Sequence, residues 1–578
     1  MIATHNEAIW IYPNVDSNWH QTIIKEFNIH PVTAYVLAAR RFQTLEEIHA
    51  FLYAKLPDLH DPHLFLDMDK AVDRVLEALK KNEHILIYGD NDVDGITAAT
   101  LLTEFLRFIG AKVSFHIPNP NAMRQSIMLD ALEFATQNAC KLIITVDCGI
   151  TAAGEIEEVV RHNIDVIVTD HHEPTARIPH CIATLNPKLI NSTYPNRNLT
   201  GVGVAFKLAH ALTNALTDNG TISSTKIDLK RYLDLVALGT IADMGSLLGE
   251  NRILVRYGLR QLRKTKRIGL SKLFAVCDLK LGDITPMDIA SKVAPRLNSL
   301  GRIADPRKGV ELLLIRDATA AEALANELDL NNIERQRIER RDSDDIEKYI
   351  SKNPKILSHR AIVLASEKWH PGIIPIITAR IAKQYNRPTV IISIDNKIGK
   401  GSIRTIPEFP LLHHLRDNAD LLENFGGHDY AAGLMIKQEN IDTFTERFIK
   451  KADDVLKEQD IITKLHLDAL IEFDDLTFDF MESFSLLEPF GNENPAPILY
   501  CKAKQVWPPK VIGKTHLKLY LEQKRMLEGI AFGMADRRAP LAKKDIQLDI
   551  AFTPHINNFL NKASIQLQIK DFKIIDSQ

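Results

Sequence analysis

Short apolar runs alternate with amphipathic stretches through the first part of the chain. Both faces of each run are hydrophobic, as in strands buried inside a parallel sheet. The runs lie at 85–88, 112–117, 142–146 and 166–169. Stretches with helical spacing lie before and between them, at 71–80, 97–109, 125–138 and 152–162. The pattern predicts an α/β domain with a mostly parallel, doubly wound sheet.

The pattern changes further along the chain. Helices are predicted at 232–243 and 252–264, followed by a long polar helix at 318–352 with a thin apolar stripe. A second α/β pattern begins near residue 361, and apolar and polar residues alternate from about residue 456, as in a small OB-like β-barrel. We expect five segments: 1–60 (helical), 61–317 (first α/β domain), 318–355 (connecting helix), 356–455 (second α/β domain) and 456–578 (barrel).

Composition excludes several classes of protein. The 578 residues are 45% hydrophobic and 25% charged, which is ordinary for a chain of several globular domains. Met1–Pro13 lacks a signal pattern, and no apolar stretch is long enough to span a bilayer. Five scattered cysteines without a CxxC pair indicate a cytoplasmic protein rather than a disulfide framework or zinc ribbon. The net charge of −3 means that any nucleic-acid-binding surface must be local.

Acidic residues and histidines directly follow three of the predicted strands. They are Asp90, Asp92 and Asp94 after the first run, Asp147 after the third, and Asp170, His171 and His172 after the fourth. The carboxyl ends of parallel strands meet at one sheet edge, and crowded carboxylates there favour bound divalent cations. Taken singly, an Asp-x-Asp is often a loop cap and a His-His pair is often structural. The three clusters together predict two Mn²⁺ or Mg²⁺ ions, the arrangement used for in-line attack of water on a phosphodiester.

In this prediction Asp147 lies between the two ions and His171 supplies a nitrogen ligand. His172 hydrogen-bonds a phosphate oxygen or orients the groups around the ions.

These clusters resemble motifs I to III of the DHH phosphoesterases, and Ala237–Asp243 resembles motif IV. Within that superfamily the chain is most similar to the RecJ family of single-strand-specific 5′→3′ DNA exonucleases. The similarity runs from about residue 40 to 535. Further matching motifs are Gly249–Arg252, Pro295–Asn298, Gly301-Arg302, Trp369–Gly372, Gly426–His428 and Pro489–Gly491.

The resemblance implies roles for individual residues. Two Mn²⁺ or Mg²⁺ ions would be held by Asp92, Asp94, Asp147, His171 and Asp243, with Asp90 and Asp170 in support. Catalytic roles are implied for His172, Arg302 and His428, and substrate contacts for Asn298, Ser402, Arg404, Gly426 and Gly427. The second α/β domain would be the DHH-associated domain, in which Ser402 and Arg404 anchor the 5′-terminal phosphate. Without the resemblance, residues 400–404 are typical of a polar turn and 426–428 of a helix C-cap with a surface histidine.

Two further groups of residues allow alternatives. Arg252, Arg256, Arg260, Arg263 and Arg267 recur at helical spacing, which predicts either a phosphate-binding face or a solvated helix face. The barrel mixes aromatic and cationic residues, which suits single-strand binding, although most aromatic residues in a small barrel are core. They are Trp507, Tyr520 and Phe532 with Lys502, Lys504, Lys510 and Lys514.

The chain departs from the RecJ pattern at a few positions. Pro120 stands where an arginine is expected, and Arg124 is the candidate substitute. Asn91 replaces a usual tyrosine, Pro375 lies in a helix where glycine is common, and Glu493 replaces a glycine. None of these changes removes a predicted metal ligand, so we expect a divergent but active member.

The sequence therefore predicts a single-stranded-DNA-specific 5′→3′ exonuclease that releases 5′-mononucleotides in repair and recombination. Expected partners are single-stranded DNA, a helicase and a single-strand-binding protein, with the enzyme itself a monomer. Three rivals share part of the pattern: a DHH enzyme of small substrates, an inorganic pyrophosphatase and a non-catalytic binding protein. The barrel argues against the first, and the complete set of predicted ligands argues against the last.

Overall fold

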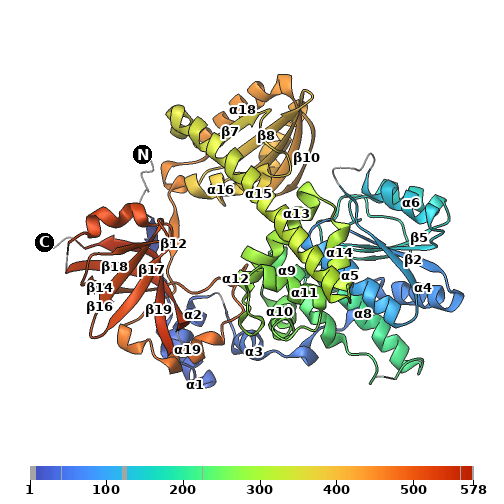
Figure 1. Cartoon of the computed structure of the whole chain (residues 1–578), viewed down its shortest axis with the longest axis horizontal. Helices are drawn as coiled ribbons and strands as arrows, with labels where there is room; N and C mark the ends of the chain where they lie inside the picture. The colour runs from blue at the N-terminus through green and yellow to red at the C-terminus, as the bar shows by residue number, and fades with distance from the viewer. Residues whose placement is uncertain are drawn as a thin grey trace. The chain divides into compact units, whose positions relative to one another are not determined.

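The computed structural model describes residues 8–40, 42–119, 126–223, 225–543, 545–559 and 562–575. The chain divides into two compact units (Figure 1). Unit 1 comprises Met1–Pro13 and Asn332–Leu467, and unit 2 comprises Asn14–Asn331 and Asp468–Gln578. In the part of the chain that the structure describes, every helix is too short or too polar to cross a membrane.

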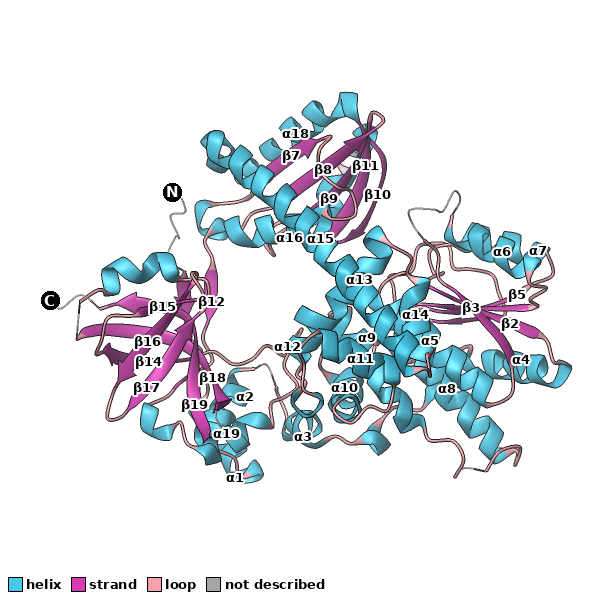
Figure 2. Cartoon of the chain, in the orientation of Figure 1, coloured by secondary structure: helices cyan, strands magenta, loops and turns pink. Residues whose placement is uncertain are grey.

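Unit 2 contains the predicted parallel sheet, in the strand order β3-β2-β4-β5-β6. The strands are β2 (His84–Gly89), β3 (Lys112–His116), β4 (Leu142–Val146), β5 (Asp165–Thr169) and β6 (Ala183–Leu185). Figure 2 shows helices on both faces of this sheet: α6 (Ile127–Gln137) and α7 (Ala153–Arg161) on one, α4 (Met68–Lys81) and α8 (Gly201–Asp218) on the other. Alternate residues of β2 are buried in two separate cores. Ile85 and Ile87 belong to one core, and Leu86 and Tyr88 belong to the other. The doubly wound prediction is confirmed, and only the short edge strand β6 was not expected.

A helical layer completes this part of unit 2. Its members are α5 (Val93–Phe108), α9 (Leu233–Ala242), α10 (Gly249–Leu262), α11 (Ile268–Val276), α12 (Pro286–Asp288), α13 (Ala294–Ile303) and α14 (Arg307–Leu314). All of them except α12 contribute to the core that also takes up one face of the sheet. Helices α5, α9 and α13 of this layer lie, together with α8, beside the carboxyl edge of the sheet.

The N-terminal segment is only partly helical. Helices α1 (Ser17–Phe27), α2 (Pro31–Ala39) and α3 (Leu45–Tyr53) were expected, but β1 (Ile9–Ile11) was not. β1 pairs in parallel with β12 (Lys464–His466) inside unit 1. The prediction of a purely helical start was wrong because a three-residue strand is too short to leave an alternating pattern.

The C-terminal sheet closes into the expected OB-like barrel. Its strands are β13 (Ala469–Leu470), β14 (Leu499–Gln505), β15 (Lys510–Ile512), β16 (His516–Glu522), β17 (Met526–Ala531), β18 (Ile546–Phe559) and β19 (Lys562–Ile574). The order β14-β18-β19-β17-β16 is closed by pairing of β16 with β14. Alternate residues such as Leu517, Leu519 and Leu521 are fully buried. They share one core with α1–α3 and with α19 (Phe478–Ser485).

Unit 1 is a second α/β domain. Its sheet has the order β10-β11-β9-β8-β7. The strands are β7 (Ile362–Ser366), β8 (Thr389–Asp395), β9 (Ile398–Arg404), β10 (Leu422–His428) and β11 (Ala431–Lys437), with helices α16 (Ile374–Tyr385), α17 (Leu411–Arg416) and α18 (Ile441–Val455). The long helix α15 (Ala318–Lys352) has the predicted bounds, and the boundary between the two units falls within it.

Candidate metal centre

The carboxyl ends of three parallel strands lie in register at one edge of the sheet in unit 2. Gly89 of β2 pairs with Val146 of β4, which pairs with Thr169 of β5. The next residues of the three strands begin the three acidic clusters. The predicted convergence of these clusters at one sheet edge is therefore confirmed.

Asp92 and Asp94 belong to the start of helix α5. Asp92 is the N-cap, and its carboxylate accepts the N–H of Gly95 at 3.1 Å. Asp94 is fully buried, and its oxygens accept the N–H groups of Gly201 and Val202 at 2.7 and 2.9 Å. Since those N–H groups are unpaired donors at the start of α8, Asp94 also caps this second helix. Helix α5 begins four residues before the expected residue 97, so the N-cap role of Asp92 was not predicted. The capping of α8 by Asp94 was not predicted either, because it joins segments far apart in the sequence.

Asp147 adopts a backbone conformation that few side chains tolerate. Its φ angle is +60°, in the left-handed region. The residue is 1% exposed, and its Oδ1 accepts no hydrogen bond from any described residue. A strained backbone and an unsatisfied buried oxygen at one residue are typical of a functional site.

Gly201 makes room for the Asp147 side chain. A Cβ at Gly201 would lie 2.5 Å from Oδ1 and 2.7 Å from Cγ of Asp147, closer than any packing allows. Sequence reasoning missed this residue. Its only signal is the pair Gly201 and Gly203 at the start of a helix, where glycine is unfavourable unless space requires it.

His171 lies among three carboxylates from three different elements. Its Nε2 is 3.1 Å from Oδ1 of Asp147, 3.7 Å from Oδ2 of Asp243 and 4.0 Å from Oδ2 of Asp94. Asp243 is the C-cap of α9. Potential ligand atoms lie within 4.8 Å of one another in three overlapping groups: Asp94–His171–Asp243, Asp147–His171–His172 and Asp90–Asp92–Asp147.

Asp170 and His172 form a supporting pair beside these groups. Asp170 accepts the N–H groups of His171, His172 and Ile150 at 2.7, 3.0 and 2.9 Å. It also lies 2.8 Å from Nδ1 of His172. Burial lowers the pKa of His172, but the bond to Asp170 outweighs it and raises the pKa to about 9. Oδ1 of Asp170 thus holds the histidine pair, and Oδ2 is taken by the N–H of Ile150.

The remaining carboxylates are difficult to ionise together. Burial raises the pKa of Asp94 and of Asp147, and neighbouring carboxylates raise both further. Burial, followed by the nearby charge of Asp92, raises the pKa of Asp90 and of Asp243 to about 7. A divalent cation would offset this crowding. Several carboxylate oxygens with one imidazole nitrogen suit Mn²⁺ or Mg²⁺, so the residues fit these ions.

Helix α13 borders this site. Oδ1 of Asn298 accepts the N–H of Val93 at 3.1 Å. A Cβ at Gly301 would lie 2.6 Å from the carbonyl oxygen of Asn91. Arg302 follows Gly301 in the last turn of the helix. The structure thus brings Asn298 and Gly301 beside the loop that carries Asp92, and Arg302 is the next residue of the helix.

The predicted substrate residues of unit 1 form two rows across its sheet. The rows are Gly426–Gly433–Ser402 and His428–Ala431–Arg404. Residues that pair across strands, or lie two apart along a strand, share a face. Ser402, Arg404 and His428 therefore lie on one face, and a Cβ at Gly426 would meet no atom within 4 Å. The alternatives of a polar turn and a helix C-cap were wrong, because these residues lie in β9 and β10.

Hydrogen bonds of Arg404 and a close backbone contact at Gly427 hold the residues of this face in place. Arg404 donates from Nη1 to the carbonyl oxygen of Ile403 at 2.8 Å and to Oγ of Ser402 at 3.3 Å. Gly427 has φ +142°, and a Cβ there would lie 2.3 Å from the carbonyl oxygen of Ala431. Only glycine fits this position.

Neither predicted alternative describes all five arginines, because Arg252 is buried and Arg260 is exposed. Arg252 is 2% exposed and donates from Nε to the carbonyl oxygen of Phe51 at 2.7 Å. Arg256 donates from Nη1 to the carbonyl oxygen of Leu52 at 2.8 Å. These carbonyls lie in the last turn of α3, so the guanidinium groups cap that helix. Arg267 pairs with two acidic side chains.

Aromatic residues gather on the surface of the barrel. Trp507 and Phe532 are 46% and 52% exposed, so the prediction that such residues are core is wrong for both. The Tyr520 ring lies 5.3 Å from that of Trp507, and Nζ of Lys518 and of Lys510 lie 5.4 and 5.8 Å from the Tyr520 ring centre.

The atypical positions have separate outcomes. Pro120 and Arg124 lie outside the described residues. Pro375 occupies the first turn of α16, where the missing N–H of proline has no helical partner to lose. Glu493 has φ +57°, the conformation for which glycine is usual, and its carboxylate accepts a hydrogen bond from Ser246.

Comparison with known proteins first defines the class. The model of the DHH family N-terminal domain matches residues 84–240, the model of the DHHA1 domain residues 358–458, and the model of the RecJ OB domain residues 467–571. The fold and the acidic edge thus define a DHH protein with an OB barrel.

Individual relatives then define the family. The chain is 34% identical to the single-stranded-DNA-specific exonuclease RecJ of Bacillus subtilis, over 98% of this chain and 71% of the relative. It is 32% identical to RecJ of Haemophilus influenzae, over 95% of this chain and 97% of the relative. A crystal structure of Thermus thermophilus RecJ in complex with Mn²⁺ matches with a TM-score of 0.81 and 27% identity. The match covers 99% of this chain and 81% of that chain. The chain belongs to the RecJ family, as its motifs predicted.

Proposed function

We propose that the chain is a single-stranded-DNA-specific exonuclease that hydrolyses phosphodiesters from the 5′ end, with two Mn²⁺ or Mg²⁺ ions, and releases 5′-mononucleotides. The observation that carries the proposal is the convergence of Asp94, Asp147 and Asp243 on His171 at one sheet edge. The names of the RecJ relatives support the substrate, and T. thermophilus RecJ structures in complex with Mn²⁺ and Mg²⁺ support the ions.

Five residues would hold the cations: Asp92, Asp94, Asp147, His171 and Asp243. When bound, the two ions would lower the pKa of the attacking water and offset charge on the phosphoryl oxygens. Asp90 would support this group from the end of β2. The double role of Asp94, as ligand and as cap of α8, would fix the position of this carboxylate before the ions bind.

The basic side chains would act on the phosphate. In the protein without metal ions burial lowers the pKa of His172, but the pairing with Asp170 outweighs this and raises it to about 9; the pairing favours the protonated ring and fixes its orientation. Its second N–H can therefore donate to a phosphate oxygen. Arg302 would contact the scissile phosphate, and Asn298 would contribute to substrate binding by fixing the loop at Val93.

Unit 1 would bind the 5′-terminal nucleotide. Ser402 and Arg404 would bind its phosphate, since a hydroxyl and a guanidinium on one face suit a phosphate group. Gly426 and Gly427 leave the backbone accessible, and His428 lies in the neighbouring row of the same face. The barrel would stack bases of the single strand on Trp507.

The cellular setting follows from family resemblance. We propose a cytoplasmic enzyme of DNA repair and recombination, and the five free cysteines agree with a reducing compartment. Binding to a helicase and to a single-strand-binding protein stays a prediction, and so does the monomeric state.

The test is digestion of end-labelled single-stranded DNA with Mn²⁺. Wild type should release a 5′ label first, as a mononucleotide, and should leave duplex DNA intact. Asp147→Asn keeps the shape of the side chain and removes its charge, so activity should fall at least about 10³-fold. Asp73→Asn, an exposed acid on α4, is the matched control. Prior loss of a 3′ label, or full activity of Asp147→Asn, would contradict the proposal.

The same assay separates the rivals. An enzyme of small substrates should hydrolyse a dinucleotide equally well after Trp507→Ala, and an inorganic pyrophosphatase should act on pyrophosphate. Deleting the barrel is a poor test, because the barrel shares a core with α1–α3 and its loss would uncover them.

A further inference from the structure

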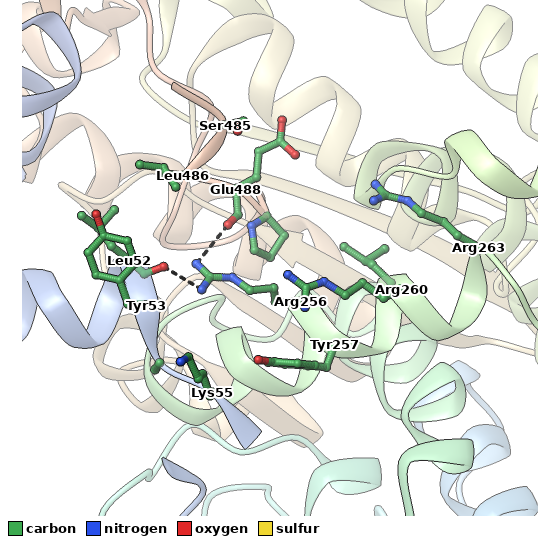
Figure 3. A pocket seen from close by; sticks show the side chains of 13 residues that line it. Leu52, Tyr53, Lys55, Arg256, Tyr257, Arg260, Arg263, Ser485, Leu486 and Glu488 are labelled. Carbon is green, nitrogen blue, oxygen red and sulfur yellow. Dashed lines mark hydrogen bonds between the residues drawn. The ribbon is translucent and has the colours of Figure 1, made fainter. Parts of the chain in front are cut away.

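A pocket of about 500 Å³ lies in unit 2 between α3, α10 and the segment after α19 (Figure 3). None of the residues that line it belongs to the metal centre. Its volume is within the range of sites that hold a small organic ligand.

The lining is strongly basic in a chain whose net charge is −3. Its lining includes four cationic side chains, Lys55, Arg256, Arg260 and Arg263, and one acidic side chain, Glu488. The arginines recur at intervals of four and three along α10 and its C-cap, which places them on one face. Figure 3 shows Arg256 and Arg260 side by side, with the Tyr257 ring beside Arg260.

Contacts within unit 2 fix the arginines before any ligand binds. Nη2 of Arg256 donates to the carbonyl oxygens of Phe51 and Glu488 at 3.1 and 3.5 Å. Arg256 donates to the carbonyl oxygen of Leu52 at 2.8 Å, and Nε of Arg263 donates to that of Ile284 at 2.9 Å. Arg260 lies over the Tyr257 ring at 4.8 Å and forms no ion pair or hydrogen bond with any described residue. Its guanidinium is therefore available to a ligand.

We infer that this pocket is a second phosphate-binding site, which takes the phosphate of a nucleotide. Guanidinium groups match the geometry of phosphate oxygens, and aromatic rings such as that of Tyr257 can stack on a nucleobase. The choice of a nucleotide over other phosphate esters rests on the proposed function, since the reaction would produce 5′-mononucleotides. The phosphate could belong to a free mononucleotide or to the backbone of a bound strand.

The test is calorimetric titration of the full chain in EDTA, which excludes binding through metal ions. All proteins carry Arg404→Gln, so that the proposed 5′-phosphate site in unit 1 does not contribute. The probes are dAMP, deoxyadenosine, inorganic phosphate and an oligo-dA strand. Because the assay involves no hydrolysis, its failure and a failure of the proposed nuclease activity are distinguishable.

Arg260→Gln removes one cation without removing a structural bond, and the affinity for dAMP should fall about tenfold. Lys264→Gln is the matched control, because Lys264 is exposed, follows Arg263 and lies outside the pocket. Lys264→Gln should leave the affinity for dAMP unchanged. Glu488→Gln should strengthen binding, because it removes the single acid. Deoxyadenosine should not bind.

Each outcome decides the inference. Binding of dAMP that depends on Arg260 supports a mononucleotide site, and binding of oligo-dA alone with the same dependence supports a backbone phosphate. Equal affinities of wild type, Arg260→Gln and Lys264→Gln would overturn the inference. Binding of a glutamate-rich peptide through Arg260, without any nucleotide binding, would overturn it as well.

Discussion

Replacing Gly201 by alanine should damage the metal centre without unfolding the protein. The added Cβ would lie 2.5 Å from Oδ1 and 2.6 Å from Cβ of Asp147. Asp147 cannot retreat freely, because its backbone is already in the left-handed region and its N–H is bonded to the carbonyl oxygen of Thr169 at 2.9 Å. The carboxylate must therefore turn away from His171, its neighbour at 3.1 Å.

The size of the effect follows from these distances. Ordinary contact begins at 3.4 Å, so Oδ1, which would lie at 2.5 Å, must move by about 0.9 Å. A misplacement of about 1 Å in an active site costs about 10²-fold in rate. We expect the exonuclease rate to fall about 10²-fold. Stability should change by less than about 1 kcal/mol, because alanine is the better helix former and offsets part of the strain.

The assay combines single-turnover digestion of labelled single-stranded DNA with Mn²⁺ titration and thermal unfolding. Gly154→Ala is the matched control, a glycine of α7 whose added Cβ would meet nothing closer than 3.8 Å. It should keep full activity. If Gly201→Ala digested DNA and bound Mn²⁺ like the wild type, the reasoning about Asp147 would be refuted.

Three further predictions concern other parts of unit 2. Lys207 and Glu250 form an ion pair and are 0% and 1% exposed, so Glu250→Gln leaves a buried charge and should cost about 3–5 kcal/mol in urea unfolding. An unchanged urea midpoint for Glu250→Gln would contradict the predicted loss of stability. The pKa of His172, about 9, is above its ordinary 6.5. Its pairing with Asp170 should therefore stabilise the EDTA-treated protein fully below pH 6.5 and be lost as pH rises through 9. His172 is 43% exposed, so the gain is about 1 kcal/mol, and Asp170→Asn should abolish this pH dependence of the melting temperature. Trp507→Ala should weaken binding of oligo-dT by about 1–3 kcal/mol in fluorescence anisotropy, and equal affinity would exclude stacking there.

The parallel sheet could be predicted because its strands bury both faces. Strand β4 covers the predicted range 142–146, and its five residues are all fully buried. The long helix α15 was predicted with its bounds because no glycine or proline interrupts it. Strands β9 and β10 of unit 1 were missed, since glycine, lysine and asparagine have low strand propensity and pairing with β11 decides their conformation.

The acidic clusters of the metal centre were predicted because each begins directly after a strand, and Asp243, at the end of α9, was predicted only through the family resemblance. The contacts between distant segments were not predicted. Nothing near Gly201 in the sequence indicates that Asp147 lies against it. In the same way, the helical spacing of Arg252 and Arg256 indicates a common face but not that the carbonyls of α3 lie opposite. Such contacts depend on tertiary packing, which periodicity does not encode.

Strand β1 has a consequence for how the chain matures. Strand β1 is synthesised before the first segment of unit 2. Its partner β12 (Lys464–His466) is synthesised only after that segment and most of unit 1. Unit 1 therefore cannot be finished until hundreds of intervening residues have emerged, and its first strand must wait with an unpaired edge during synthesis. Amino-terminal extensions or trimming up to Pro13 would act on this late pairing step, at a distance in sequence from the acidic residues at the sheet edge of unit 2.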